Sequence, residues 1–305
     1  MYSIINKTVY IVFLFLILGC ADKVKEENEV QEEPSKPEIT VSNNWNVSFL
    51  LDLSDRIDPL KYPNKSMDYY KRDVGYINNI AEVFSAHLGT KKNRSMDDRI
   101  QLFFDPSPLN PEINSISKKL KYNITKDNIT LELLNEIKDT YSTLPLDIYD
   151  LAIKDGNYVG SDTWKFFKNK VQDYCVEVGY RNILIILSDG YIYHEDTKYH
   201  EGNLTTYITP ETIRADKLNN SNWKAKMEKD NFGFIPLDQD LSNLEILVIG
   251  INPAVNNNPY EEDVIKAYWI SWFKQMGVKK YDIKNADLPS NMGSVIKNFI
   301  LSNES

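Results

Sequence analysis

Residues 49–59 read FLLDLSDRIDP, and this stretch decides how the rest of the chain is interpreted. An apolar run ends abruptly on three acids and one serine within positions 52–58, with Arg56 among them. A second apolar run, RNILIILSDG (181–190), also ends on a serine and an acid, Asp189. Such runs are typical of strands buried on both faces of a parallel sheet, and ligands bind at the carboxyl ends of these strands. We therefore expect the two polar turns to lie together and to form a binding edge.

Apolar runs alternate with helical patterns along most of the chain. Strands are expected at 46–54, 99–105, 181–190 and 244–252, with a short edge strand at 279–286. Helices are expected at 67–88, 130–144, 163–178, 260–277 and 290–302, the last with Ser290 as its cap. Strands that alternate with helices indicate a mostly parallel sheet that is covered on both faces. The predicted fold class is α/β, with a doubly wound, mostly parallel sheet and helices on both faces.

The N-terminus has the pattern of an export signal. Lys7 precedes an apolar run from Val9 to Leu18, which is shorter than the roughly 20 residues of a membrane-spanning helix and fits the core of a secretory signal. The run closes on LILGC (16–20), which resembles the lipobox of bacterial lipoproteins. The resemblance implies a signal peptide at 1–19 and a lipid on Cys20. Residues 20–44 are charged and lack aromatic side chains, so they are expected to form a disordered acidic tether.

These features predict an envelope lipoprotein that is held to a membrane by its N-terminal lipid without spanning it. The acids after Cys20 resemble the export signal of surface lipoproteins in Bacteroidetes-type bacteria, which implies an outer-membrane location with exposure at the surface. A simply solvated linker fits the same acids equally well. The net charge of −9 and the pI near 5.0 disfavour nucleic acid as a partner. With Cys20 lipidated, Cys175 has no disulfide partner.

Three motifs around the predicted binding edge resemble those of von Willebrand factor type A (VWA) domains. The resemblance implies the Rossmann-like fold of that family. In that family the first strand ends in Asp-x-Ser-x-Ser, a later loop gives Thr, and a middle strand ends in Thr-Asp-Gly. Together these residues form a metal-ion-dependent adhesion site. Here DLSDR (52–56) supplies Asp52 and Ser54, GSDTWKF (160–166) supplies Ser161 with Thr163 as the alternative, and LSDG (187–190) supplies Asp189.

The resemblance covers about Trp45 to Asn303, and the predicted VWA-like domain is 45–305. It implies that Asp52, Ser54, Ser161 or Thr163, and Asp189 bind Mg²⁺ or Mn²⁺. These hard ions take about six oxygen ligands, so part of the shell stays open to water or to a carboxylate of a protein partner.

Arg56 departs from the family pattern, because it occupies the place of the second serine. A guanidinium cannot ligate a cation and is permanently charged. It could pair with Asp52 or Asp189 and replace the metal, which would leave a metal-free VWA-like scaffold with Arg56 closing the site. It could instead turn outward and leave Asp55 or water to complete the metal shell. The sequence leaves both alternatives open.

More than fifty residues separate Asp189 from the next strand at Leu244, so an insertion is predicted at about 191–243. It follows Asp189 directly and must therefore emerge at the binding edge. Tyr191, Tyr193 and Tyr199 lie in it, and tyrosine is favoured at interfaces. We expect these tyrosines to build the surface that binds a protein partner; the alternative is a long polar loop without a role.

An enzyme of the α/β hydrolase or phosphatase class is the remaining alternative. It would pair Ser54 or Ser188 as nucleophile with His194 as base. The Gly-x-Ser-x-Gly motif of hydrolases is absent from the sequence, and so are the glycine-rich motifs that bind dinucleotides and nucleotide phosphates. The sequence therefore favours a binding module without catalytic residues.

Overall fold

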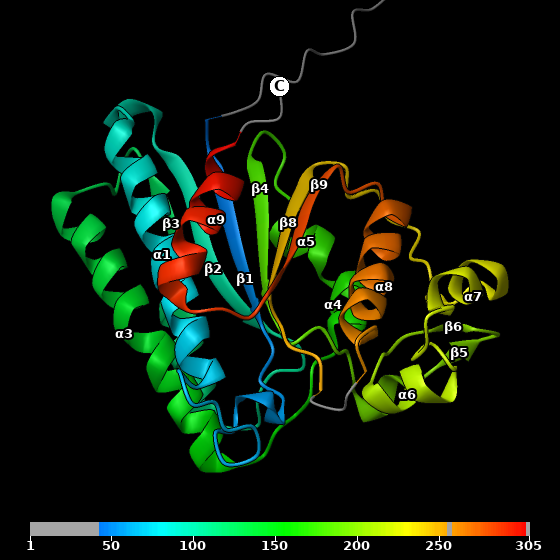
Figure 1. Cartoon of the computed structure of the whole chain (residues 1–305). Helices are drawn as coiled ribbons and strands as arrows, with labels where there is room; N and C mark the ends of the chain where they lie inside the picture. Colours follow the sequence, from blue (N-terminus) through cyan, green and yellow to red (C-terminus); the bar gives the residue numbers. More distant parts are fainter. Residues whose placement is uncertain (1–42, 255–257, 303–305) are drawn as a thin grey trace, which may run out of the picture. The chain divides into compact units, whose positions relative to one another are not determined.

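Strand β1 (Trp45–Leu51) lies inside a six-stranded sheet and is buried along its whole length. The strand order is β3-β2-β1-β4-β8-β9, and every neighbouring pair is parallel except β2–β3. The other five strands are β2 (Asp97–Phe104), β3 (Tyr122–Thr125), β4 (Arg181–Leu187), β8 (Leu244–Ile251) and β9 (Lys280–Asn285). The expected fold class, a doubly wound and mostly parallel α/β sheet, is confirmed (Figure 1).

The computed structural model describes residues 43–254 and 258–302. The chain divides into two units, Met1–Ile39 and Thr40–Ser305, and every described residue belongs to the second. The predicted signal peptide, Cys20 and the tether up to residue 42 lie outside the described residues. Within those residues, no helix has the length and apolar character needed to cross a membrane.

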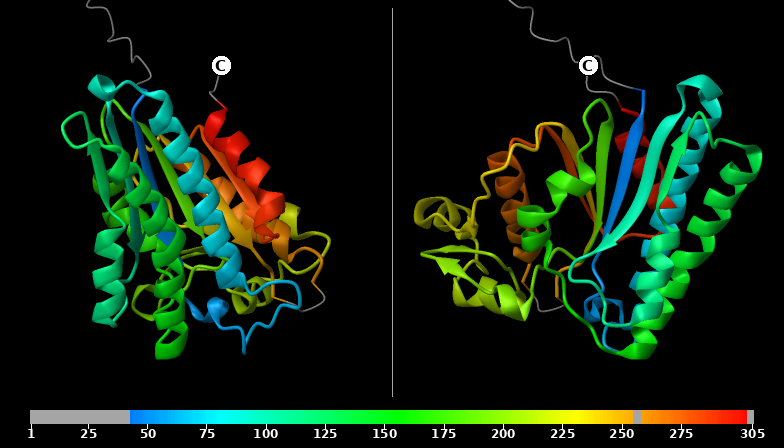
Figure 2. Two further views of the ribbon diagram at one scale, coloured as in Figure 1. Left: turned by 90° about the vertical axis from the view of Figure 1, so that its left-hand side faces the viewer. Right: turned by 180° about the vertical axis from the view of Figure 1, so that it is seen from behind.

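Two hydrophobic layers cover the two faces of the sheet (Figures 1 and 2). The first layer consists of α1 (Tyr69–Thr90), α2 (Pro111–Lys119), α3 (Leu131–Asp155) and α9 (Pro289–Leu301). The second consists of α4 (Thr163–Asn169), α5 (Val171–Cys175) and α8 (Glu261–Gln275). Alternate residues of β1 serve both layers, since Val47 and Phe49 join the first core and Leu50 the second. This burial on both faces explains the continuous apolar runs in the sequence.

Several helix boundaries differ from the sequence prediction. Helix α3 continues through Pro145 to Asp155, because Ile148, Tyr149 and Ala152 continue its buried face and their packing outweighs the cost of an internal proline. The helix expected at 163–178 divides at Lys170 into α4 and α5. Helix α9 begins at Pro289 with Leu288 at its cap position, so the expected Ser290 cap is wrong. Helix α2 and strand β3 had no clear pattern in the sequence.

The predicted insertion is folded and contributes to the second core. It contains a small sheet of β5 (His200–Glu201), β6 (Leu204–Thr205) and β7 (Gly233–Phe234), with helices α6 (Pro210–Ala215) and α7 (Trp223–Asp230). Its buried apolar side chains belong to the same core as α8, among them Ile192, Ile208, Ile213, Leu218 and Phe234. The segment is therefore a structured part of the second layer rather than a long polar loop.

Candidate functional site

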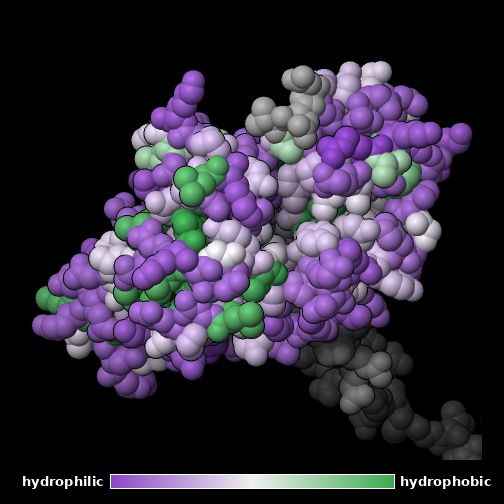
Figure 3. Space-filling model, turned by 90° about the horizontal axis from the view of Figure 1, so that it is seen from below, coloured by the Kyte–Doolittle hydropathy of each residue, from purple (hydrophilic) through white to green (hydrophobic). Residues whose placement is uncertain are grey.

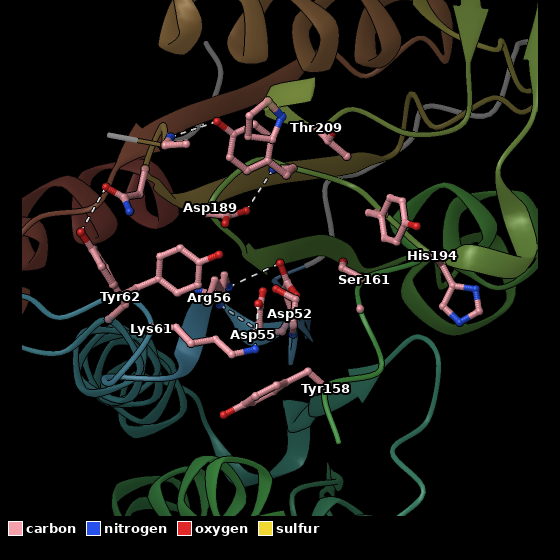
Figure 4. Close-up of a pocket in the computed structure, with 18 of the residues that line it drawn as sticks. Asp52, Asp55, Arg56, Lys61, Tyr62, Tyr158, Ser161, Asp189, His194 and Thr209 are labelled. Atoms are coloured by element: carbon pink, nitrogen blue, oxygen red, sulfur yellow. Dashed lines mark hydrogen bonds and ion pairs between the residues drawn. The ribbon is translucent and has the colours of Figure 1, made fainter. Parts of the chain in front are cut away.

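A cleft of about 1110 Å³ opens where β1 and β4 end. After β1 the chain continues to β2 on one side of it. After β4 the chain continues to β8 on the opposite side, so the loops that leave β1 and β4 diverge. Such a switch point is where open α/β sheets bind ligands. Asp52, Ser54, Ser161 and Asp189 come from three distant segments and line this cleft. Figure 4 shows Asp52, Ser161 and Asp189 in place. The remaining predicted ligand, Thr163, is buried and does not line it.

Asp52 is buried at the floor of the cleft, and both of its carboxylate oxygens accept hydrogen bonds. Oδ1 accepts from the backbone N–H of Ser54 at 2.8 Å, which turns the chain immediately after β1. Oδ2 accepts from the Ser188 hydroxyl at 3.1 Å, which ties the end of β1 to the end of β4. The hydroxyl of Ser54 makes no capping hydrogen bond and remains available to the cleft.

Arg56 is buried and directs its guanidinium inward, toward α1. Its Nη2 donates to Asp73 Oδ2 at 2.6 Å and to the Leu187 carbonyl oxygen at 2.9 Å, while Nε lies 3.4 Å from Asp52 Oδ2. The Tyr149 hydroxyl of α3 donates to the same Asp73 oxygen at 3.0 Å. Burial lowers the pKa of Arg56, but the carboxylates of Asp73 and Asp52 outweigh it and raise the pKa above its ordinary value. The guanidinium therefore stays charged.

The main partner of Arg56 was not among the sequence alternatives. The expected pairing with Asp52 exists only as the longer 3.4 Å contact, and no ion pair between described residues joins Arg56 to Asp189. The alternative in which the Arg56 side chain turns outward is wrong, because Arg56 is only 5% exposed. Arg56 thus mainly balances the charge of Asp73. It offsets only part of the negative charge of Asp52 and Asp189 in the cleft.

Asp189 is the second carboxylate of the cleft floor. Its Oδ1 accepts the backbone N–H of Tyr191 at 3.0 Å, and Oδ2 makes no hydrogen bond to a described residue. Burial and then the negative charge of Asp52 raise the pKa of Asp189 to about 7, against the opposing effect of Arg56. A cation placed between the two carboxylates would relieve this repulsion.

The loop at Gly160–Thr163 brings the hydroxyl of Ser161 to the cleft. Ser161 and Tyr193 exchange two backbone hydrogen bonds of 3.1 Å, and Asp162 caps helix α4 by accepting from the Lys165 N–H. Gly160 has φ +77°, and a Cβ at this position would lie 2.6 Å from the Tyr193 carbonyl oxygen. Only glycine permits this close approach. The hydroxyls of Ser161 and Thr163 lie 3.0 Å apart, with Ser161 on the cleft side.

The oxygen donors of the cleft floor suit a hard divalent cation. Ser54 and Ser161 supply hydroxyls, Asp189 supplies an oxygen without a hydrogen bond, and the Asp52 carboxylate retains further lone pairs. Arg56 is the opposing feature, since its Nε lies 3.4 Å from Asp52 Oδ2. Over residues 43–254 and 258–302, no group of three or more His, Cys, Asp or Glu side chains could hold a metal ion. The candidate site depends on hydroxyls as well as carboxylates.

The three tyrosines predicted for partner binding occupy different places. The Tyr191 hydroxyl accepts from the Ala254 N–H at 3.0 Å and donates to Glu261, so this ring is held in the cleft wall. Tyr193 lines the cleft and is 40% exposed. Tyr199 is more exposed but borders a separate, smaller pocket.

The nucleophile–base pair of the hydrolase alternative is not assembled in this arrangement. The Ser188 hydroxyl is buried and bonds to Asp52, and the Ser54 hydroxyl makes no hydrogen bond to His194. Nδ1 of His194 instead faces Asp162 Oδ2 at 3.7 Å.

Asp73 and Tyr149, which hold Arg56 in place, were not predicted from the sequence. Asp73 was detectable in principle: it lies three residues after Tyr70 and four before Ile77, on the buried face of α1, where a charged residue requires a partner. Tyr149 lies beyond Pro145, in the part of α3 that the sequence did not predict.

Comparisons with known proteins give little further information. No protein-family model matches the chain, and no curated protein matches it. Two crystal structures of the pilus adhesin SpaC from Lactobacillus rhamnosus GG, one of them in an open conformation, align with TM-scores of 0.38 at 12% and 14% sequence identity. Each alignment covers 84% of this chain but only 30% and 29% of the adhesin, so this chain spans less than a third of the adhesin's length. The fold assignment therefore depends on the sheet topology itself.

Proposed function

We propose that this chain is a lipid-anchored envelope protein whose VWA-like domain binds a protein partner at the cleft through a divalent cation. The observation that carries the proposal is the convergence of Asp52, Ser54, Ser161 and Asp189 on one cleft at the switch point of the sheet. These are the residues that the VWA resemblance implies as metal ligands. The direction of Arg56 supports the proposal, because its shortest ion pair is with Asp73 and not with the cleft floor.

In this proposal each residue has a limited role. Asp52 and Asp189 supply the negative charge that attracts Mg²⁺ or Mn²⁺, and Ser54 and Ser161 supply neutral oxygen ligands. Water and an oxygen of the partner complete the shell of about six ligands. Cys20 carries the lipid that holds the chain at the membrane, and no nucleic acid and no catalytic step are involved.

The test is a titration with Mg²⁺ and Mn²⁺ that follows the melting temperature. A ligand that binds the folded state stabilises it by about 2.7 kcal/mol at 100-fold excess over Kd, which corresponds to a rise of roughly 5–10 °C for a domain of this size. Asp52→Ala and Asp189→Ala should each abolish the rise. Asp196→Ala is the matched control, since it removes a carboxylate from the rim of the same cleft and should preserve the rise. The absence of any rise at millimolar metal in the wild type would refute the metal site.

A metal-free scaffold is the second candidate. It is favoured by the contact of Arg56 Nε with Asp52 Oδ2 and by the two hydrogen bonds that Asp52 already accepts. If this scaffold is correct, Arg56→Ser should create metal binding by restoring the family pattern. Asp73 should then be changed to Asn in the same variant, because it would otherwise remain buried without its cation. A metal-dependent rise in the double variant alone would select the scaffold.

A further inference from the structure

The walls of the cleft carry more negative charge than the proposed metal site uses. Six carboxylates line the cleft together with two cationic side chains, Arg56 and Lys61. Two further cations outside the lining, Lys198 and Arg214, pair with Glu195 and Glu211, so the acids still outnumber the cations. The four acids beyond the metal site are Asp55, Glu195, Asp196 and Glu211. Arg56 is already paired with Asp73, and Asp196 has no ion pair with any described residue. Figure 3 shows that the surface on this side of the molecule is predominantly hydrophilic.

Two acids of the lining, each beside a tyrosine ring of the lining, already pair with an ammonium group of the chain itself. Lys61 Nζ lies 3.1 Å from Asp55 Oδ2 and 5.0 Å from the centroid of the Tyr158 ring. Lys198 Nζ, which does not line the cleft, lies 2.9 Å from Glu195 Oε1 and 5.4 Å from the centroid of the Tyr193 ring. A carboxylate beside an aromatic face is a favourable position for a cation.

The two internal lysines can be displaced from these positions. The side chains of Lys61 and Asp55 are 50% and 44% exposed, and those of Lys198 and Glu195 are 35% and 70% exposed. Exposed ion pairs of this kind contribute about 0–1 kcal/mol, so an incoming cation meets little competition. The cleft has a volume of about 1110 Å³, which is large enough for side chains of another protein.

We propose that the partner is a protein that inserts lysine or arginine side chains into the cleft, beside Tyr158 and Tyr193. The proposal depends on the proposed function only in placing the partner at the cleft, and it does not require a metal. Basic side chains neutralise the surplus carboxylates and stack on the half-buried Tyr158 and the more exposed Tyr193. A neutral ligand would leave the surplus charge unbalanced, and an acidic partner would be repelled everywhere except at a bound metal.

The test uses the full-length chain in detergent and a short fluorescent peptide of alternating lysine and glycine, with EDTA present. The variant Glu195→Gln/Asp196→Asn removes one ion-paired and one unpaired carboxylate from the cleft. Its matched control, Glu228→Gln/Asp230→Asn on α7, likewise removes one unpaired acid and one that is paired with Lys226, away from the cleft. Both variants lower the net negative charge equally, so non-specific attraction of the peptide changes equally. The cleft variant should weaken peptide binding about fivefold or more, and the control less than about twofold.

Equal weakening by the two variants would overturn the proposal, because it would show attraction to the overall charge alone. Preferential binding of a matched glutamate–glycine peptide or of a neutral oligosaccharide would also overturn it. Because EDTA removes divalent cations, this outcome is independent of the metal titration. Failure of the metal site and failure of the basic-partner proposal can therefore be distinguished.

Discussion

Replacing Arg56 by methionine should destabilise the domain strongly. Methionine keeps much of the side-chain volume but removes the cation that lies 2.6 Å from Asp73 Oδ2. Asp73 is 1% exposed and would retain only the hydrogen bond from the Tyr149 hydroxyl. The Leu187 carbonyl oxygen would also lose the guanidinium donor. Removing one partner of a buried ion pair typically costs about 3–5 kcal/mol, and we expect a loss of that size.

The double variant Arg56→Met/Asp73→Asn separates the effect of charge from that of packing. Asparagine carries no charge and can still accept from the Tyr149 hydroxyl, so the double variant should be more stable than Arg56→Met by about 1–2 kcal/mol. The assay is urea denaturation of the unit Thr40–Ser305, followed by the fluorescence of the buried Trp269 and Trp272.

The pH dependence gives an independent check on Arg56→Met. Burial raises the pKa of Asp73, and loss of Arg56 raises it further, because Arg56 lowers it in the wild type. Protonation then removes the buried charge, so the destabilisation of Arg56→Met should be smaller at low pH than at neutral pH. A loss below about 1 kcal/mol in the single variant, or a double variant that is no more stable than it, would refute the reasoning.

Two further predictions concern the anchor and the cleft floor. Cys20→Ser should release the chain from the membrane fraction or block signal processing, and a fully processed variant that still sediments with membranes would contradict the lipoprotein assignment. The pKa of Asp189 is raised from 3.8 to about 7 in the folded state. The contribution of this raised pKa to the free energy of unfolding is complete below about pH 4, and it is lost as the pH rises through 7. Relative to Asp189→Asn, the wild type should therefore lose up to a few kcal/mol between pH 4 and pH 8, measured by urea denaturation at each pH; a difference that does not change with pH would contradict the raised pKa.

The sheet could be predicted because its central strands are buried on both faces. β1 and β4 are unbroken apolar runs in the sequence, and their polar ends predicted that polar side chains meet at one edge of the sheet. Asp52, Ser54, Ser161 and Asp189 line one cleft for the same reason, since strand ends and the helix-starting loop fix where such residues lie. Short elements such as α2 and β3 lacked a repeat long enough to recognise.

The surroundings of Arg56 could not be predicted, because they depend on how two helices pack. Asp73 and Tyr149 come from α1 and α3, and only the packing of these helices brings both side chains beneath β1. The part of α3 after Pro145 was not predicted either, because an internal proline normally ends a helix. Local sequence patterns contain neither fact, and both determine what Arg56 does.

The position of β1 has a mechanical consequence. The chain enters this strand at Trp45, and Asp52 follows its other end, so the cleft lies at the far end of the strand from the N-terminal connection. Tension between an N-terminal anchor and a partner held in the cleft would pull along the length of β1. Six residue pairs with β2 and seven with β4 flank the strand, and a pull along its axis loads all of these contacts in shear at once. Peeling an edge strand breaks its pairs one at a time, whereas β1 yields only when both ladders slip together, so the strand that leads to the cleft resists a pull along its axis.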